Sequence, residues 1–147
     1  MSEQRLQQTL SAIDISKAQL ENLSRQQEMV RSSLEEHTRA KETVEQISKA
    51  EEGEEILVPV GAGVFLHAKV GSKKSGIANV GASIMMERGM QEIVKMLDSR
   101  MEELRKASAE LDEQTEKIAY AIEQLSADAQ QQYVQLQKLP KTAGKSK

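Results

Sequence analysis

Two glycine-rich segments are the first candidates for chemistry in this chain, because glycine-rich loops can bind phosphate groups. The segment Gly61-Ala62-Gly63 has the first two glycines of a dinucleotide-binding motif, but it lacks the third, and no helix is expected after it. Residues 71–76 have the spacing of a phosphate-binding loop, yet Ile77-Ala78 stand where that loop needs lysine and serine or threonine. We therefore interpret the first segment as a turn and the second as a plain loop.

Metal-binding and nucleophilic side chains indicate no site either. The chain has no cysteine, which excludes disulfides and thiolate ligands. Its two histidines fall on different expected elements, His37 at a core position of a helical repeat and His67 on a strand. No nucleophile lies in a pattern with a paired base. We predict no catalytic residue, no metal, no cofactor and no enzymatic activity.

The composition is typical of long solvated helices rather than of a globular core. Among 147 residues there are one Phe, two Tyr and no Trp, 29% are charged, and the mean hydropathy is −0.55. A net charge of −3 gives no general attraction to nucleic acid or to an anionic membrane. No apolar run approaches the roughly 20 residues of a membrane span. We expect a soluble cytoplasmic protein that binds neither nucleic acid nor membranes.

Heptad repeats occupy both ends of the chain. In residues 1–52, apolar side chains at a and d positions recur at Leu6, Ile13, Leu20, Leu23, Val30, Leu34 and Val44. In residues 89–139, they recur at Val94, Leu97, Met101, Leu104, Leu111, Ile118, Ile122, Leu125, Ala129, Leu136 and Leu139. Each pattern predicts a helix that buries a narrow stripe against another helix. The first helix is expected over 2–52, before Gly53, and the second from Gly89 or Met90 to the residue before Pro140.

The period changes from seven to two in residues 53–88, which predicts strands. Val60-Gly61-Ala62-Gly63-Val64 is echoed by Val80-Gly81-Ala82-Ser83-Ile84, so two β-hairpins with related turns are expected. The fold class is therefore mainly α with a small β part, in which a long antiparallel coiled-coil hairpin carries two β-hairpins at its closed end. Residues 140–147 form a short basic tail that we expect to be disordered.

The two hairpins cannot bury both of their faces alone, because isolated hairpins are marginal in water and have open edges. The missing core must come from other subunits, so residues 53–88 are interpreted as an assembly module. At the opposite end of the coil, four apolar side chains lie off the a/d stripe: Leu10, Ile15, Tyr133 and Val134. Exposed apolar groups gathered there suggest a surface that binds something apolar.

The order of coil, Leu57-Val58-Pro59-Val60-Gly61-Ala62-Gly63, a second hairpin built on Val80-Gly81, and coil resembles the α-type subunits of the prefoldin family, in their archaeal form. The resemblance covers about Leu6 to Leu139. One departure is that Ala82-Ser83 stand where many members have Thr-Gly after the Val-Gly pair.

The resemblance implies an ATP-independent holdase built from two α-type and four β-type subunits. Hairpins of all six would form a double β-barrel, and the coil tips would hold non-native proteins and pass them to a group II chaperonin. The residues implied in assembly are Leu57, Val58, Val60, Val64, Leu66, Ile77, Val80 and Ile84. The residues implied in binding non-native proteins at the tips are Leu6, Leu10, Ile13, Tyr133, Val134 and Leu136.

Two other functions stay open from the sequence. A structural coiled-coil adaptor would bind one folded partner tightly and would have no affinity for unfolded proteins. An accessory factor of a nucleotide-dependent chaperone would change the rate at which that chaperone releases nucleotide.

Overall fold

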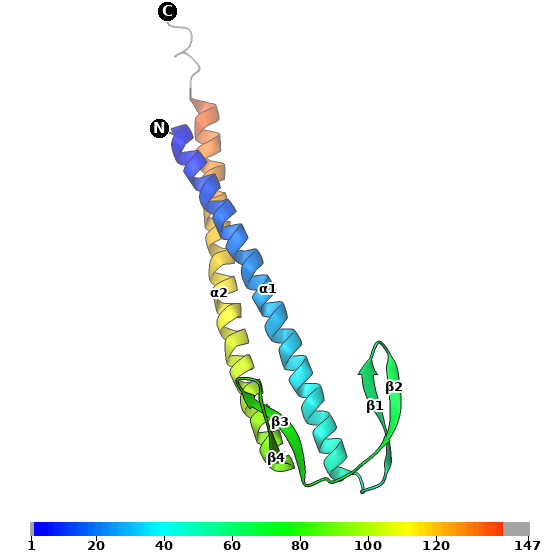
Figure 1. The fold of residues 1–147 in the computed structure, drawn as a ribbon. Helices are drawn as coiled ribbons and strands as arrows, with labels where there is room; N and C mark the ends of the chain where they lie inside the picture. Colours follow the sequence, from blue (N-terminus) through cyan, green and yellow to red (C-terminus); the bar gives the residue numbers. More distant parts are fainter. Residues whose placement is uncertain (1, 140–147) are drawn as a thin grey trace, which may run out of the picture. The chain divides into compact units, whose positions relative to one another are not determined.

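The computed structural model describes residues 2–139, which form two long antiparallel helices with two β-hairpins between them in the chain (Figure 1). This confirms the predicted architecture, whereas the predicted β-barrel assembly stays a prediction. The predicted disordered tail, residues 140–147, lies outside the described residues. The elements are α1 (Ser2–Lys49), β1 (Glu55–Gly61), β2 (Val64–Lys69), β3 (Ser75–Gly81), β4 (Ile84–Gly89) and α2 (Met90–Lys138).

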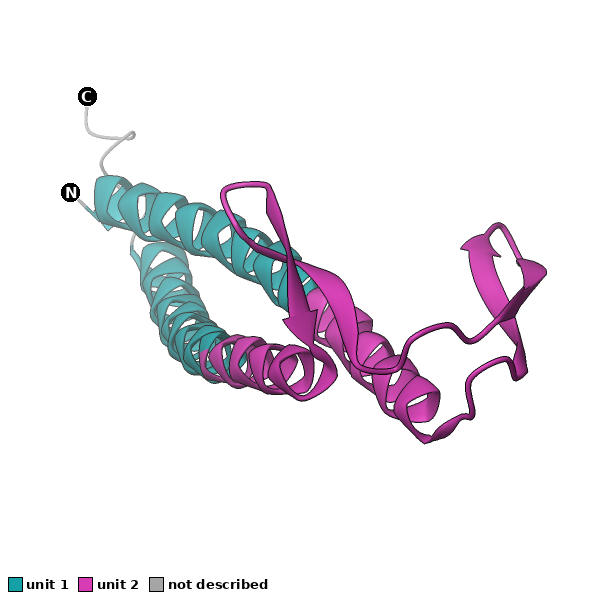
Figure 2. Ribbon diagram, turned by 60° about the horizontal axis from the view of Figure 1, so that its bottom comes forward, with its two compact units in different colours: residues 1–30, 107–147 teal, residues 31–106 magenta. Residues whose placement is uncertain are grey.

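The chain divides into two compact units, shown in different colours in Figure 2. Unit 1 contains the start of α1 and the end of α2, residues 1–30 and 107–147, of which 2–30 and 107–139 are described. Unit 2, residues 31–106, contains the end of α1, both hairpins and the start of α2.

In unit 1 the helices pair through the predicted heptad stripe. The buried apolar side chains are Ile13, Leu23, Leu111 and Ala129, all of them at a or d positions. Hydrogen bonds cross between the helices among the described residues of this unit, from Gln27 Nε2 to Asp112 Oδ1 at 2.9 Å and from Gln132 Nε2 to Thr9 Oγ1 at 3.2 Å. Thr9 precedes Gln27 on α1, whereas its partner Gln132 follows Asp112 on α2, as antiparallel pairing requires.

Helix α1 ends at Lys49 rather than at the expected Glu52. After the helix the chain turns, with a hydrogen bond from Glu54 N–H to the carbonyl of Glu51 at 3.0 Å. This turn contains Gly53, whose φ of 84° lies in the left-handed region that glycine adopts without strain. Its N–H donates to the carbonyl of Val70 at 2.7 Å, and Val70 N–H donates to the carbonyl of Glu54 at 2.9 Å. The chain must leave the helix before Gly53 to make these bonds, which close the base of the first hairpin.

The hairpins β1–β2 and β3–β4 have the same construction. Both are antiparallel, and each has a register irregularity one residue before its turn, at Val60 and at Val80. The turn residues Ala62-Gly63 and Ala82-Ser83 all have positive φ, the signature of a type I′ turn. The internal sequence echo therefore corresponds to a structural repeat, and the replacement of Thr-Gly by Ala82-Ser83 leaves positive φ at both positions.

The second hairpin lies on the helices of unit 2, and the first does not (Figures 1 and 2). Ala78 of β3 is buried with Ile93 and Leu97 of α2, and Ala40, Val44, Met90 and Met96 pack against this cluster. Arg100 of α2 also donates a hydrogen bond to the carbonyl of Asn79. Packing and a charge-assisted bond thus hold β3–β4 against the start of α2.

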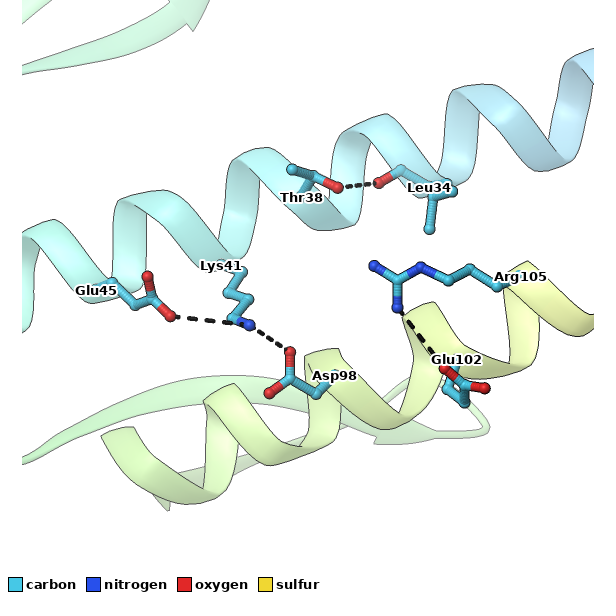
Figure 3. Close-up of polar contacts among 7 residues, drawn as sticks. All are labelled: Leu34, Thr38, Lys41, Glu45, Asp98, Glu102 and Arg105. Atoms are coloured by element: carbon cyan, nitrogen blue, oxygen red, sulfur yellow. Dashed lines mark hydrogen bonds and ion pairs between the residues drawn. The ribbon is translucent and has the colours of Figure 1, made fainter.

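Charged side chains join the two helices within unit 2 (Figure 3). Lys41 Nζ lies 2.7 Å from Asp98 Oδ1 on the other helix and 3.9 Å from Glu45 Oε1 one turn along its own helix. The hydrogen bond with Asp98 is the largest influence on Lys41 and raises its pKa above the ordinary value. Lys41 occupies an a position of the first heptad pattern, seven residues after Leu34, where an apolar residue is usual.

Candidate interaction surfaces

The first hairpin exposes apolar side chains on both faces. Val58 and Leu66 pair across the strands on one face, and Leu57 and Phe65 lie on the other. Leu57 and Phe65 are each 58% exposed, and Val58 and Leu66 are exposed as well. A strand with apolar residues on both faces is typical of a sheet that is covered on both sides.

The second hairpin is covered at Ala78 on one face and is open on the other. Ala78 packs on the helix, whereas Ile77 of β3 and Met85 of β4 are exposed. All the residues predicted for assembly are exposed in the single chain: Leu57, Val58, Val60, Val64, Leu66, Ile77, Val80 and Ile84. The chain brings them onto two hairpins and leaves them without cover, and their role in assembly stays a prediction.

The structure adds three exposed apolar residues that the sequence analysis did not select for assembly: Phe65, Met85 and Met86. On β2 the selection took Val64 and Leu66 and left out Phe65, because Phe65 shares its face with His67, which the sequence analysis placed on a strand as a polar residue. A signal was present in the sequence, since Phe65 is the only phenylalanine of the chain. An aromatic side chain in a predicted strand of an aromatic-poor protein is a strong candidate for burial in an interface.

An apolar groove lies in unit 1 at the tip, which we define as residues 2–17 and 126–139. It has a volume of about 370 Å³ and is lined by Leu6, Leu10, Ile13, Asp14, Lys17, Ser126, Ala129, Gln130 and Tyr133. Leu10 is 43% exposed and Tyr133 51% exposed, and both line this groove. The groove gathers four of the residues predicted to bind non-native proteins.

The residues predicted for the tip differ in exposure and in position relative to the groove. Ile13 lines the groove but is buried in the helix contact, so it forms the floor of the groove rather than its rim. Val134 and Leu136 are half-buried and do not line the groove. Binding of non-native proteins by any of these residues stays a prediction.

Unit 1 has exposed apolar residues outside the tip groove as well. Met29 is 72% exposed and Tyr120 63% exposed. Met29 lines a separate groove of about 400 Å³ with Val30, Ala107 and Leu111. These positions provide apolar surface of similar exposure that does not line the tip groove.

Within residues 2–139, no three acidic or histidine side chains gather as a metal site would require. The Nδ1 atom of His37 lies 2.7 Å from the carbonyl oxygen of Ser33, a contact within its own helix. In the same part of the chain, neither helix carries an apolar stretch long enough to cross a bilayer.

Known proteins resemble this chain in sequence and in fold. A family model described as prefoldin subunit matches residues 16–135. Prefoldin subunit alpha of Methanopyrus kandleri is 38% identical over 82 residues, which are 56% of this chain and about half (52%) of that protein. Prefoldin subunit alpha 1 of Methanocaldococcus jannaschii is 34% identical over 125 residues, 85% of each protein.

The fold resembles that of a chain of filamentous PFD from Methanocaldococcus jannaschii, solved by cryo-electron microscopy. The TM-score is 0.68 at 23% identity, and the match covers 80% of this chain and 98% of the other. Prefoldin is a non-enzymatic chaperone, in line with the absence of any catalytic pattern in the sequence. The family match extends over most of the described residues and includes both helices and both hairpins, and the chain therefore belongs to the prefoldin family, in its alpha-subunit class.

Proposed function

We propose that this chain is the α-type subunit of an ATP-independent holdase that binds non-native proteins at the coil tips and passes them to a group II chaperonin. The observation that carries the client-binding part is the tip groove, where Leu10 and Tyr133 from opposite helices present exposed apolar surface together. The chaperone role itself follows from the family.

Assembly would use the hairpins. The uncovered apolar side chains on both faces of β1–β2 need apolar partners, and the open strand edges need hydrogen-bond partners. Hairpins from β-type subunits supply both kinds of partner. The proposed complex contains two chains of this type and four β-type chains, with their hairpins joined in a double β-barrel.

Client binding would be weak at each tip and strong in the complex. A non-native protein exposes apolar side chains, and each buried methylene contributes roughly 0.8 kcal/mol. A groove of about 370 Å³ accommodates only a few such groups. Several tips on one platform raise the effective concentration and so multiply the affinity. Release then requires an acceptor that encloses the client more fully, and no nucleotide.

The test replaces the rim of the tip groove in the complex. Leu10→Ser combined with Tyr133→Ser removes the two exposed apolar side chains and leaves the hairpins unchanged. We expect native mass spectrometry to give the same subunit composition as for the unmodified complex. We expect protection of a chemically denatured client against aggregation to fall, with light scattering as the measurement.

The matched control is Met29→Ser combined with Tyr120→Ser, which removes apolar side chains that are more exposed and lie outside the tip groove. It should leave protection unchanged. Equal loss in both variants would indicate a dependence on total apolar surface rather than on the groove. Full protection by the tip variant would remove the tip assignment. Tight binding of one folded protein with no affinity for the denatured client would instead favour the structural adaptor.

A further inference from the structure

Two polar side chains are buried between the helices at the tip, where a coiled coil normally places apolar residues. Thr9 and Gln132 are each 8% exposed, and they are the buried polar residues of the described chain. Both fall on d positions of the heptad patterns, seven residues or a multiple of seven from Leu23 and Leu125 respectively. The neighbours Leu10 and Tyr133 form the rim of the tip groove.

The two side chains belong to one hydrogen-bonded layer. Gln132 Nε2 donates to Thr9 Oγ1 at 3.2 Å and to Asp128 Oδ2, one turn earlier on the same helix, at 2.8 Å. The Thr9 hydroxyl in turn donates to the carbonyl of Arg5 at 3.0 Å. The amide of Gln132 thereby connects α2 to α1, and its bond to Asp128 fixes the direction in which it points.

The layer does not maximise stability. Gln132 Oε1 is buried and has no hydrogen-bond partner among the described residues, which is an unfavourable arrangement for an amide. An apolar pair at these two positions would bury its surface without that cost. A polar residue at a core position of a coiled coil is known instead to select one alignment of the helices, because any other alignment buries it without its partner.

Alignment matters at this end because the groove takes its rim from both helices. A shift by half a heptad would place Gln132 against the apolar Leu6 or Ile13 and would move Tyr133 away from Leu10. We propose that Thr9 and Gln132 are positioning residues, which hold the two helix ends in the one alignment that puts Leu10 and Tyr133 on the same groove. The inference rests on the proposed function, in which that groove binds the client.

The test uses the absence of cysteine in the chain. Gln8→Cys and Gln131→Cys lie at exposed positions on the two helices and carry spin labels in the assembled complex. Double electron–electron resonance gives the distribution of distances between the two labels. We compare the labelled chain with the same chain carrying Thr9→Val and Gln132→Leu. The apolar variant should unfold at the same temperature or a higher one, yet its distance distribution should broaden.

The client assay gives the second readout. Protection of a denatured client by the apolar variant should fall about as far as for Leu10→Ser with Tyr133→Ser. Because the apolar variant is at least as stable, this loss would not reflect unfolding. Thr9→Ser with Gln132 unchanged retains the hydroxyl, so this variant should keep both the narrow distance distribution and the protection of the unmodified chain. A purely steric role of Thr9 would not explain that result.

The outcomes are separable. An unchanged distance distribution, or undiminished protection by the apolar variant, would overturn the positioning role. Full protection by Leu10→Ser with Tyr133→Ser would instead reject the client site on which the inference rests. In that case the distance distribution still decides whether Thr9 and Gln132 align the helices.

Discussion

A β-carbon placed on Gly76 would lie 3.0 Å from the Cδ1 atom of Ile93. This close approach brings strand β3 onto helix α2, where Ala78 joins the buried cluster. The second hairpin is thus seated on the helices because the residue at its entrance has no side chain. The first hairpin has no comparable contact with the helices in unit 2 and is closed at its base by backbone bonds of Gly53 and Val70.

Gly76→Ala should destabilise the protein by about 1 kcal/mol, because the added methyl group lies closer to the buried Ile93 side chain than ordinary van der Waals contact and that side chain must shift. Gly71→Ala is the matched control, since a β-carbon there meets no atom within 4 Å, and it should be neutral or slightly stabilising. Thermal unfolding of the two variants measures the difference. Equal unfolding temperatures would show that β3 does not pack against Ile93 of α2 as closely as described.

Ser83→Gly should stabilise the second hairpin by about 1 kcal/mol. Ser83 has a φ of 63°, in the left-handed region that costs an L-residue free energy and costs glycine little. Gly63, with a φ of 75°, occupies the corresponding place in the first hairpin, and Gly63→Ala should destabilise by a similar amount. Urea denaturation of both variants checks the prediction, and changes of the same sign in both would contradict it.

Leu97→Ala should cost about 2–4 kcal/mol, since it removes a buried side chain from the cluster that joins β3 to α2. Met29→Ala, at a largely exposed position, should change stability by less than about 0.5 kcal/mol. Chemical denaturation gives both values. A similar effect at the two positions would mean that the cluster contributes little to the stability of the fold.

The bridge between Lys41 and Asp98 should lose its contribution to stability in strongly alkaline solution, where Lys41 loses its charge. The hydrogen bond with Asp98 raises the pKa of Lys41 above its ordinary value of 10.5. The charged lysine is therefore favoured by folding. Its contribution is complete below the unfolded pKa and is lost as the pH rises through the higher folded value.

The check compares Lys41→Gln with the unmodified chain by thermal unfolding. The variant should unfold at a lower temperature by the same small amount at about pH 7 and about pH 9, and the difference should disappear in more alkaline solution. High salt should also reduce the difference, because the pair is exposed to solvent. A gap that widens with pH would contradict the sign of the pKa shift.

The sequence alone determined which segments are helical and which are strands. Leu97, Leu104 and Leu111 recur every seven residues, a period that places side chains in one stripe only on a helix. The repeated Val-Gly-Ala segment specifies two hairpins with similar turns. These are local properties of the chain, so no knowledge of distant contacts was needed to read them. The surplus of apolar strand residues also indicated that the hairpins need partners.

The tertiary structure decided what the periodicity leaves free. The sequence does not specify that β3–β4 rests on α2 while β1–β2 stands clear, because that depends on the fit between Gly76 and Ile93. Nor does it show that Thr9 meets Gln132 across the helix pair, since each is only a polar interruption of its own heptads. Periodicity gives the face that each element buries, whereas the pairing of one residue with another far along the chain is settled by how the side chains pack.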